Sequence, residues 1–191
     1  MKALVIVAHP DDELIWMGGF ILKNKDWTFD IISLCRKDDE DRAPKFKRVC
    51  EELNVNHCGM SDLDDEALTN VREDDIVNRI LKMLNDDEYD YVFTHGWNGE
   101  YGHKRHKEIN KAVRNMIKRG ELKCRKLFSF SYTRENGFCH INPKADKLIK
   151  LDNSTISKKK HLIVETYGFP LGGFEEKCCG QKEAFNVLEI I

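Results

Sequence analysis

The chain has 191 residues, a formal charge of -2 at pH 7, and 34% charged and 41% hydrophobic residues. This length predicts one domain with a single site, and the composition is that of an ordinary globular protein. The nearly balanced charge creates no extended positive field, so we expect no nucleic-acid partner. The short basic run at 158–160 is expected to be a solvated loop.

The sequence indicates neither a membrane segment nor a disulfide framework. The apolar run 3–8 is shorter than the hydrophobic region of a secretory signal, and no run of eighteen apolar residues could span a bilayer as a helix. The seven cysteines form an odd set without C-x-x-C spacing, which argues against a disulfide framework and a structural zinc site. We therefore expect reduced thiols in a cytoplasmic protein. For Cys178-Cys179, a redox function and an incidental pair both stay open.

The first part of the chain alternates between strand and helix patterns. Residues 4–7 form a continuous apolar run and 29–34 are mainly apolar, which predicts strands that are buried on both faces. Between them, apolar residues at helical spacing predict a helix over about 12–24. These three segments form the pattern of a βαβ unit.

The alternation continues through the middle of the chain. Apolar spacing predicts strands at 89–94 and 127–132 and helices around 46–53, 76–84 and 109–117. Asn54 is expected to end the helix that precedes it. The segment 95–102 contains three glycines, so we expect it to be irregular.

Alternating strands and helices predict an α/β, Rossmann-like fold with a doubly wound, mostly parallel sheet and helices on both faces. We expect residues 1–191 to form a single domain, in which about 153–191 are a C-terminal covering segment. Ligands of such folds bind beyond the carboxyl ends of the strands. His9 and His95 each follow a predicted strand, so this edge is the expected functional site.

The first chemical cluster is Ala8-His9-Pro10-Asp11-Asp12-Glu13, directly after the first predicted strand. Catalytic zinc takes imidazole and carboxylate ligands and leaves one position for water. A helix N-terminus also favours acidic residues, but it does not explain a histidine beside three acids that repel one another unless a cation binds them. His9 and Asp12 are therefore candidate ligands, and Asp11 can project toward a bound water.

The second cluster runs from Asn98 to His106 and leads into a predicted helix. His103 and His106 are three residues apart, so they can share one face at the start of that helix. Isolated histidines are usually structural, but this pair faces the neighbouring strand end that carries His9. For His95 we favour the role of a hydrogen-bonded strand-end residue.

These two clusters resemble the signature motifs of the PIG-L (LmbE-like) family of zinc-dependent N-deacetylases. The first cluster matches at every position, and the second, Gly99-Glu100-Tyr101-Gly102-His103-Lys104-Arg105-His106, lies at the expected distance. Enzymes of this family remove an acetyl group from N-acetylglucosamine-type conjugates. The resemblance implies a small N-acetylated sugar as substrate and Zn2+ as cofactor, although two imidazoles and one carboxylate also suit Fe2+ or Co2+.

The resemblance also implies roles by position. The metal ligands of the family correspond to His9, Asp12 and His106. Asp11 resembles the general base that deprotonates the metal-bound water, and Tyr101 resembles the tyrosine that helps to hold the oxyanion. His103 is similar to the histidine that stabilises charge or protonates the leaving amine. Arg42, ahead of Leu53-Asn54-Val55, resembles a loop arginine that contacts substrate; an exposed loop arginine is the alternative.

One departure concerns the second motif. The family commonly has His-Pro-Asp-His where this chain has His103-Lys104-Arg105-His106, so the carboxylate that would orient and charge His103 is missing. If Arg105 points inward, its positive charge should lower the pKa of His103. If Arg105 points outward, another acid must replace the missing one.

Other functions stay open at this level. The chain could be a metal hydrolase for another amide or ester, or a non-catalytic metal- or sugar-binding protein. Retention of Asp11 argues against the second, because binding a metal requires no free base. A nucleotide-binding role lacks the G-x-G-x-x-G pattern after the first strand, where Asp11-Asp12 would repel phosphate. The sequence does not indicate whether the chain self-associates.

Overall fold

The structure is a computed structural model that describes residues 1–188. Its strands are β1 (Lys2–Val7), β2 (Thr28–Ser33), β3 (His57–Met60), β4 (Glu88–Thr94), β5 (Lys123–Phe130), β6 (Tyr132–Glu135), β7 (Phe138–Ile141), β8 (Lys147–Lys150) and β9 (Lys182–Leu188). Its helices are α1 (Asp12–Lys23), α2 (Arg42–Glu52), α3 (Glu73–Met83), α4 (Gly99–Gly102), α5 (Lys104–Lys118), α6 (Asn153–His161), α7 (Phe174–Cys178) and the π-helical turn η1 (Leu162–Thr166).

A central sheet organises these elements. Within the described residues it has seven strands in the order β3-β2-β1-β4-β5-β9-β8, and β6 and β7 form a separate hairpin. The first five strands in this order, β3-β2-β1-β4-β5, are parallel to one another. Strand β9 runs antiparallel to β5 and to β8. The predicted doubly wound, mostly parallel α/β fold is therefore confirmed.

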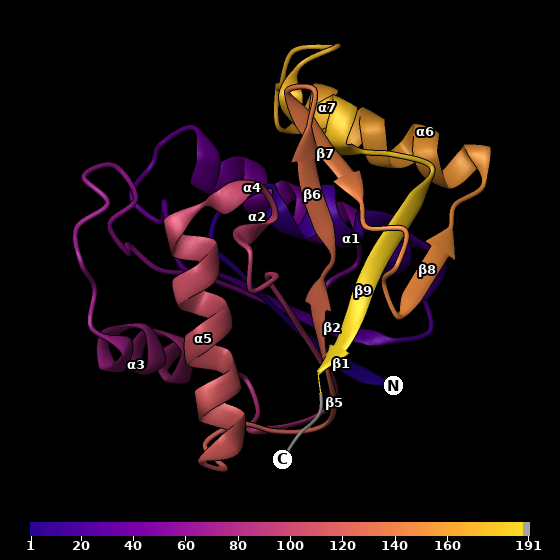
Figure 1. Cartoon of the computed structure of the whole chain (residues 1–191). Coiled ribbons are helices and arrows are strands. Elements are labelled where there is room, and N and C mark those ends of the chain that lie inside the picture. The colour runs from indigo at the N-terminus through magenta and orange to yellow at the C-terminus, as the bar shows by residue number, and fades with distance from the viewer. Residues whose placement is uncertain (189–191) are drawn as a thin grey trace.

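Helices cover both faces of the sheet, with α3 and α5 on one face and α1 and α2 on the other (Figure 1). Strand β1 shows why its sequence is apolar throughout. Alternate residues enter two different cores: Ala3, Val5 and Val7 pack on one face, and Leu4, Ile6 and Ala8 on the other. A strand buried on both faces needs apolar side chains at every position.

The C-terminal part does more than cover the sheet. Helix α6, turn η1 and helix α7 lie at the same end as the β6–β7 hairpin (Figure 1). The chain then returns as β9, which pairs with β5 and with β8 inside the sheet. The predicted covering segment over 153–191 lacks this strand, because Lys182, Glu183 and Asn186 leave only short apolar pairs in its sequence. Residues 189–191 of that segment lie outside the described part.

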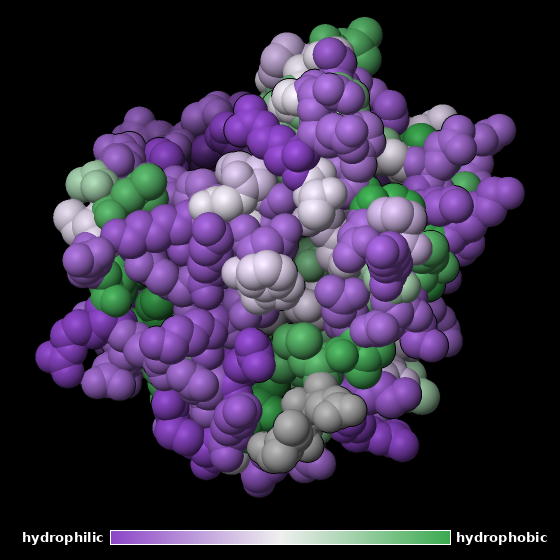
Figure 2. All heavy atoms as spheres, in the orientation of Figure 1, coloured by the Kyte–Doolittle hydropathy of each residue, from purple (hydrophilic) through white to green (hydrophobic). Residues whose placement is uncertain are grey.

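The surface view in Figure 2 is mainly hydrophilic, with smaller hydrophobic areas between the charged side chains. Among residues 1–188, no helix combines the length and apolar character needed to cross a bilayer. All seven cysteines are free thiols. Five of the seven are buried.

Candidate metal centre

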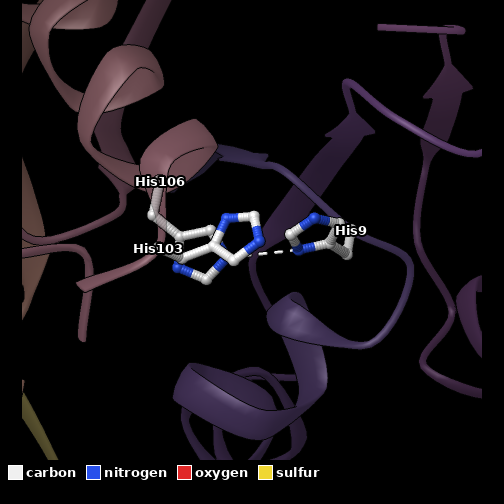
Figure 3. Close-up of side chains that lie close together, drawn as sticks. All are labelled: His9, His103 and His106. Atoms are coloured by element: carbon white, nitrogen blue, oxygen red, sulfur yellow. Dashed lines mark hydrogen bonds between the residues drawn. The ribbon is translucent and has the colours of Figure 1, made fainter. Parts of the chain in front are cut away.

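Two loops meet at the carboxyl end of the sheet because β1 and β4 are adjacent parallel strands. The loop after β1 carries His9, and the turn between α4 and α5 carries His103. Figure 3 shows the imidazole of His9 pointing toward those of His103 and His106. Residues almost a hundred positions apart in the sequence thus face one another at one site.

Three atoms form a compact cluster that we name the cage: Nδ1 of His9, Oδ2 of Asp12 and Nε2 of His106. The His9 and Asp12 atoms are 3.1 Å apart, the two imidazole nitrogens 3.2 Å, and the His106 and Asp12 atoms 3.4 Å. Two ligand atoms that each lie about 2.1 Å from a tetrahedral ion are roughly 3.4 Å apart. The donor set and its spacing fit a tetrahedral divalent cation.

Hydrogen bonds fix the orientation of the cage side chains. Oε2 of the buried Glu100 is 2.5 Å from Nδ1 of His106, so Nε2 of that ring faces the cage. The indole Nε1 of Trp16 donates to Oδ1 of Asp12 at 2.7 Å, which leaves Oδ2 for the cage. A carboxylate behind a metal-binding histidine is a common feature of metal sites. The sequence motifs alone did not identify Glu100 and Trp16 as supports of the cage.

Two further imidazoles lie next to the cage. Ligand atoms of His103 lie within 4.8 Å of those of His9 and His106, and those of His95 within the same distance of Asp12 and His106. In His95, however, Nε2 accepts the amide proton of Ala8 at 2.8 Å and Nδ1 pairs with Glu100 at 3.0 Å. Both nitrogens are therefore occupied, and His95 is a hydrogen-bonded strand-end residue.

The surroundings of the cage raise the pKa of both cage histidines. Burial would lower the pKa of His9, but the carboxylates of Asp12 and Asp65 outweigh burial and raise that pKa to about 10. Burial is likewise outweighed at His106, where Asp12 and Glu100 raise the pKa to about 9. A divalent cation would satisfy the same carboxylates in place of these protons.

Asp11 lies beside the cage in an unusual backbone conformation. Its φ of 134° is in a sparsely populated region for a residue with a side chain, a strain of about 1–3 kcal/mol. Its amide donates to Oε2 of Glu13 at 3.0 Å, and its Oδ2 accepts a hydrogen bond from Nη1 of Arg42 at 3.0 Å. Burial and the neighbouring charge of Asp12 raise the pKa of Asp11 well above its usual range.

A cavity of about 260 Å3 opens beside the cage. Its lining includes Asp11, Asp12, Arg42, Tyr101, His103 and Phe174. The ring of Tyr101 meets those of His106 and Phe174 edge to face, with centroids 5.3 and 5.4 Å away. Burial, together with the negative charges of Asp12 and Asp11, raises the pKa of Tyr101 far above its usual value, so its hydroxyl keeps its proton.

The altered second motif has a clear structural outcome. Arg105 contacts Asp64 and Glu108 and makes no hydrogen bond to the cage, so it points away from the cage although it is buried. Another acid is present: Oδ1 of Asp65 lies 3.6 Å from Nε2 of His103, too long for a hydrogen bond. Burial, followed by the charges of His106 and His9, lowers the pKa of His103 to about 4. Neither sequence motif contains Asp65, so the sequence did not predict this neighbour of His103.

A sequence model of the PIG-L family, described as GlcNAc-PI de-N-acetylase, matches residues 4–117. The chain belongs to the PIG-L family. The matched residues include all three cage side chains, Asp11 and Tyr101. An uncharacterized protein of Acanthamoeba polyphaga mimivirus is 25% identical over an alignment of length 185, and the match spans 85% of this chain and 80% of the viral protein.

Solved structures share the fold at low sequence identity. N,N'-diacetylchitobiose deacetylase from Pyrococcus horikoshii superimposes with a TM-score of 0.67 and 18% identity, covering 98% of this chain and 83% of the deacetylase. GalB, the 4-carboxy-2-hydroxymuconate hydratase from Pseudomonas putida, superimposes with a TM-score of 0.68 and 12% identity, covering 98% and 96%. One fold thus serves a deacetylase and a hydratase, so the reaction must be argued from the site.

Proposed function

We propose that this protein is a zinc-dependent N-deacetylase that hydrolyses the acetamide of a small N-acetylglucosamine-type conjugate. The observation that carries the proposal is the cage of His9, Asp12 and His106, with the carboxylate of Asp11 beside it in a cavity. Two imidazoles and one carboxylate are a donor set that suits catalytic zinc, and also iron or cobalt. Membership of a de-N-acetylase family supports the choice of an amide substrate.

When bound, the ion would supply Lewis acidity, which makes water a nucleophile near neutral pH and polarises an amide carbonyl. Asp11 would act as general base. Its Oδ2 is held by Arg42, and its Oδ1 makes no hydrogen bond within residues 1–188, so Oδ1 is free to take the proton of the attacking water. The same carboxyl would then deliver that proton to the leaving amine.

Tyr101 would stabilise the developing oxyanion. Its hydroxyl stays protonated because of its raised pKa, and it lines the cavity next to the cage. A well-placed donor of this kind contributes on the order of 3 kcal/mol to transition-state stabilisation. His103 and Arg42 also line the cavity, and we assign them to electrostatic stabilisation and substrate contact.

The proposal is tested with purified protein loaded with Zn2+ and a panel of N-acetylglucosamine conjugates, following free amine and acetate. Equal release of both products is the expected result. The panel includes 4-carboxy-2-hydroxymuconate, because a hydratase shares this fold, and also simple esters and phosphoesters. Turnover of one of these without acetate release, or sugar binding without turnover, would reject the deacetylase.

A further inference from the structure

Arg105 stands where the family motif has a carboxylate, and it is completely buried. Its guanidinium is paired with two acids: Nη2 lies 2.9 Å from Oδ2 of Asp64, and Nη1 lies 2.6 Å from Oε2 of Glu108. A buried cation is stable only when it is paired and hydrogen-bonded in this way. None of these contacts belongs to the cage, so the function proposed above leaves Arg105 without a role.

The main target of Arg105 is the loop between β3 and α3. Its Nε donates to the carbonyl of Asp64, and its Nη1 donates to the carbonyl of Thr69 at 3.0 Å. One guanidinium therefore holds both ends of the segment 64–69. The planar fork of arginine suits this task, because lysine offers a single point charge with no fixed geometry.

The carboxylate of Asp64 stabilises the same loop through hydrogen bonds to residues within it. Its Oδ1 accepts the amides of Glu66 and Ala67, and its Oδ2 accepts the amide and the hydroxyl of Thr69 at 2.9 Å. The loop also contains Leu68 at a φ of 48°, which is unusual for a leucine. Such a conformation persists only where its surroundings hold it.

The loop presents Asp65 to the cage. Oδ1 of Asp65 lies 2.8 Å from Nε2 of His9, on the side of the ring opposite the cage nitrogen. Its Oδ2 accepts a hydrogen bond from Nη2 of Arg36 at 3.0 Å. A carboxylate in this position keeps the proton of His9 on Nε2 and turns Nδ1 toward a metal.

We propose that Arg105 is a positioning residue that holds the loop 64–69, and that the loop in turn sets Asp65 against His9. The motif position that commonly carries a carboxylate thereby acts indirectly, through an acid on another loop. The proposal deepens the proposed function, since it concerns how the cage is oriented. It also explains why a buried arginine is tolerated one residue before His106.

The test is a double-mutant cycle on Zn2+ affinity, measured by competition with a chelator. Asp65→Ala should weaken Zn2+ binding about 10–100-fold, as loss of a carboxylate behind a metal-binding histidine does. Arg105→Met should weaken it by about tenfold or more. If Arg105 acts through Asp65, the double variant binds within about twofold of Asp65→Ala alone.

A second readout needs neither metal nor activity. Hydrogen exchange of the amides of Ala67 and Thr69 should become faster in metal-free Arg105→Met, because the loop loses its anchor. Arg119→Met is the matched control, since Arg119 follows the same helix but pairs with Glu73 and Glu121 at the surface. It should change neither exchange in the loop nor Zn2+ affinity.

Two results would overturn the proposal: losses of Zn2+ affinity that add in the double variant, or unchanged affinity in Arg105→Met. If Arg105→Met does not fold, the cycle is repeated with Asp64→Ala, whose side chain is 35% exposed, and the same results decide. If the unchanged protein binds no divalent ion, the proposed function fails. Hydrogen exchange of the loop amides in metal-free protein then still decides whether Arg105 holds the loop.

Discussion

The hydroxyl of Tyr167 donates a hydrogen bond of 2.6 Å to Oε1 of Glu13, which lies 154 residues earlier in the chain. The other oxygen of Glu13 accepts the amide of Asp11, the residue with the φ of 134°. The end of turn η1 thus supports the backbone of the proposed general base. Burial raises the pKa of Glu13 to about 7 against the effect of these hydrogen bonds.

Tyr167→Phe removes this support without changing the ring. We expect a loss of about 1–3 kcal/mol in the free energy of unfolding, because a buried carboxyl group loses a hydrogen-bond donor. Urea denaturation measures the change. Tyr132→Phe, which removes a hydroxyl that donates to the carbonyl of Trp16, serves as comparison and should lose only about 1 kcal/mol. A loss in Tyr167→Phe no larger than that in Tyr132→Phe would show that the buried carboxyl of Glu13 does not depend on this donor.

Asp11→Asn separates chemistry from metal binding. The amide cannot accept the proton of water, so turnover should fall by about 10²–10⁴-fold, while bound zinc, measured by elemental analysis, stays near one per chain. His106→Ala removes a cage atom and should lose both the metal and the activity. Full activity in Asp11→Asn would show that Asp11 is not the base.

Tyr101→Phe tests the oxyanion donor. The variant should keep its metal and its fold, because Tyr101 is not a cage residue and its ring packing is unchanged. Loss of one such donor lowers kcat by about 10²–10³-fold and should leave KM nearly unchanged. A change confined to KM would instead indicate a role in substrate binding.

Lys159 and Glu183 form a buried ion pair at 2.6 Å, and both side chains hydrogen-bond to the backbone of helix α1. Glu183 accepts the amides of Gly19 and Phe20, and Lys159 donates to the carbonyl of Ile15. Lys159→Met leaves the carboxylate buried without a cation, so we expect a loss of about 3–5 kcal/mol in the free energy of unfolding.

The neighbouring residue Lys158 gives the matched control for this prediction. Lys158 pairs with Glu52 at the surface, where the two side chains are 42% and 33% exposed. Lys158→Met should therefore change the free energy of unfolding by only about 0–1 kcal/mol. Denaturant melts of both variants would refute the argument if their stabilities were equal.

Cys58 should be the most reactive thiol. It is the one exposed cysteine among the described residues, and a hydrogen bond from the buried Cys50 thiol outweighs its partial burial and lowers its pKa to about 6. Because the thiolate is the nucleophile, iodoacetamide labelling of Cys58 should rise with pH around a midpoint near 6. Cys50→Ala removes the donor and should move that midpoint upward. Unchanged labelling in Cys50→Ala would contradict this cause.

Local patterns predicted most of the central fold. The run 4–7 is apolar throughout and the runs 29–34 and 89–94 are mainly apolar, and each became a parallel strand with side chains in both cores. Helical spacing predicted α5, which buries one stripe of side chains, and also α1, in which most residues are buried. Strand β3 was missed, since His57-Cys58-Gly59-Met60 is short, contains a glycine and is only partly buried.

For the candidate site too, one part could be predicted from the sequence and another part could not. The sequence by itself determined which residues could bind a cation, because the motif containing His9 and Asp12 concentrates donors directly after a strand. Only the tertiary structure decided that Glu100, Asp65 and Tyr167 support them and that Arg105 points away from the cage. These contacts join loops and turns that are distant in the chain. Spacing along the sequence reports which face of an element is buried, but it does not report which loop packs against which.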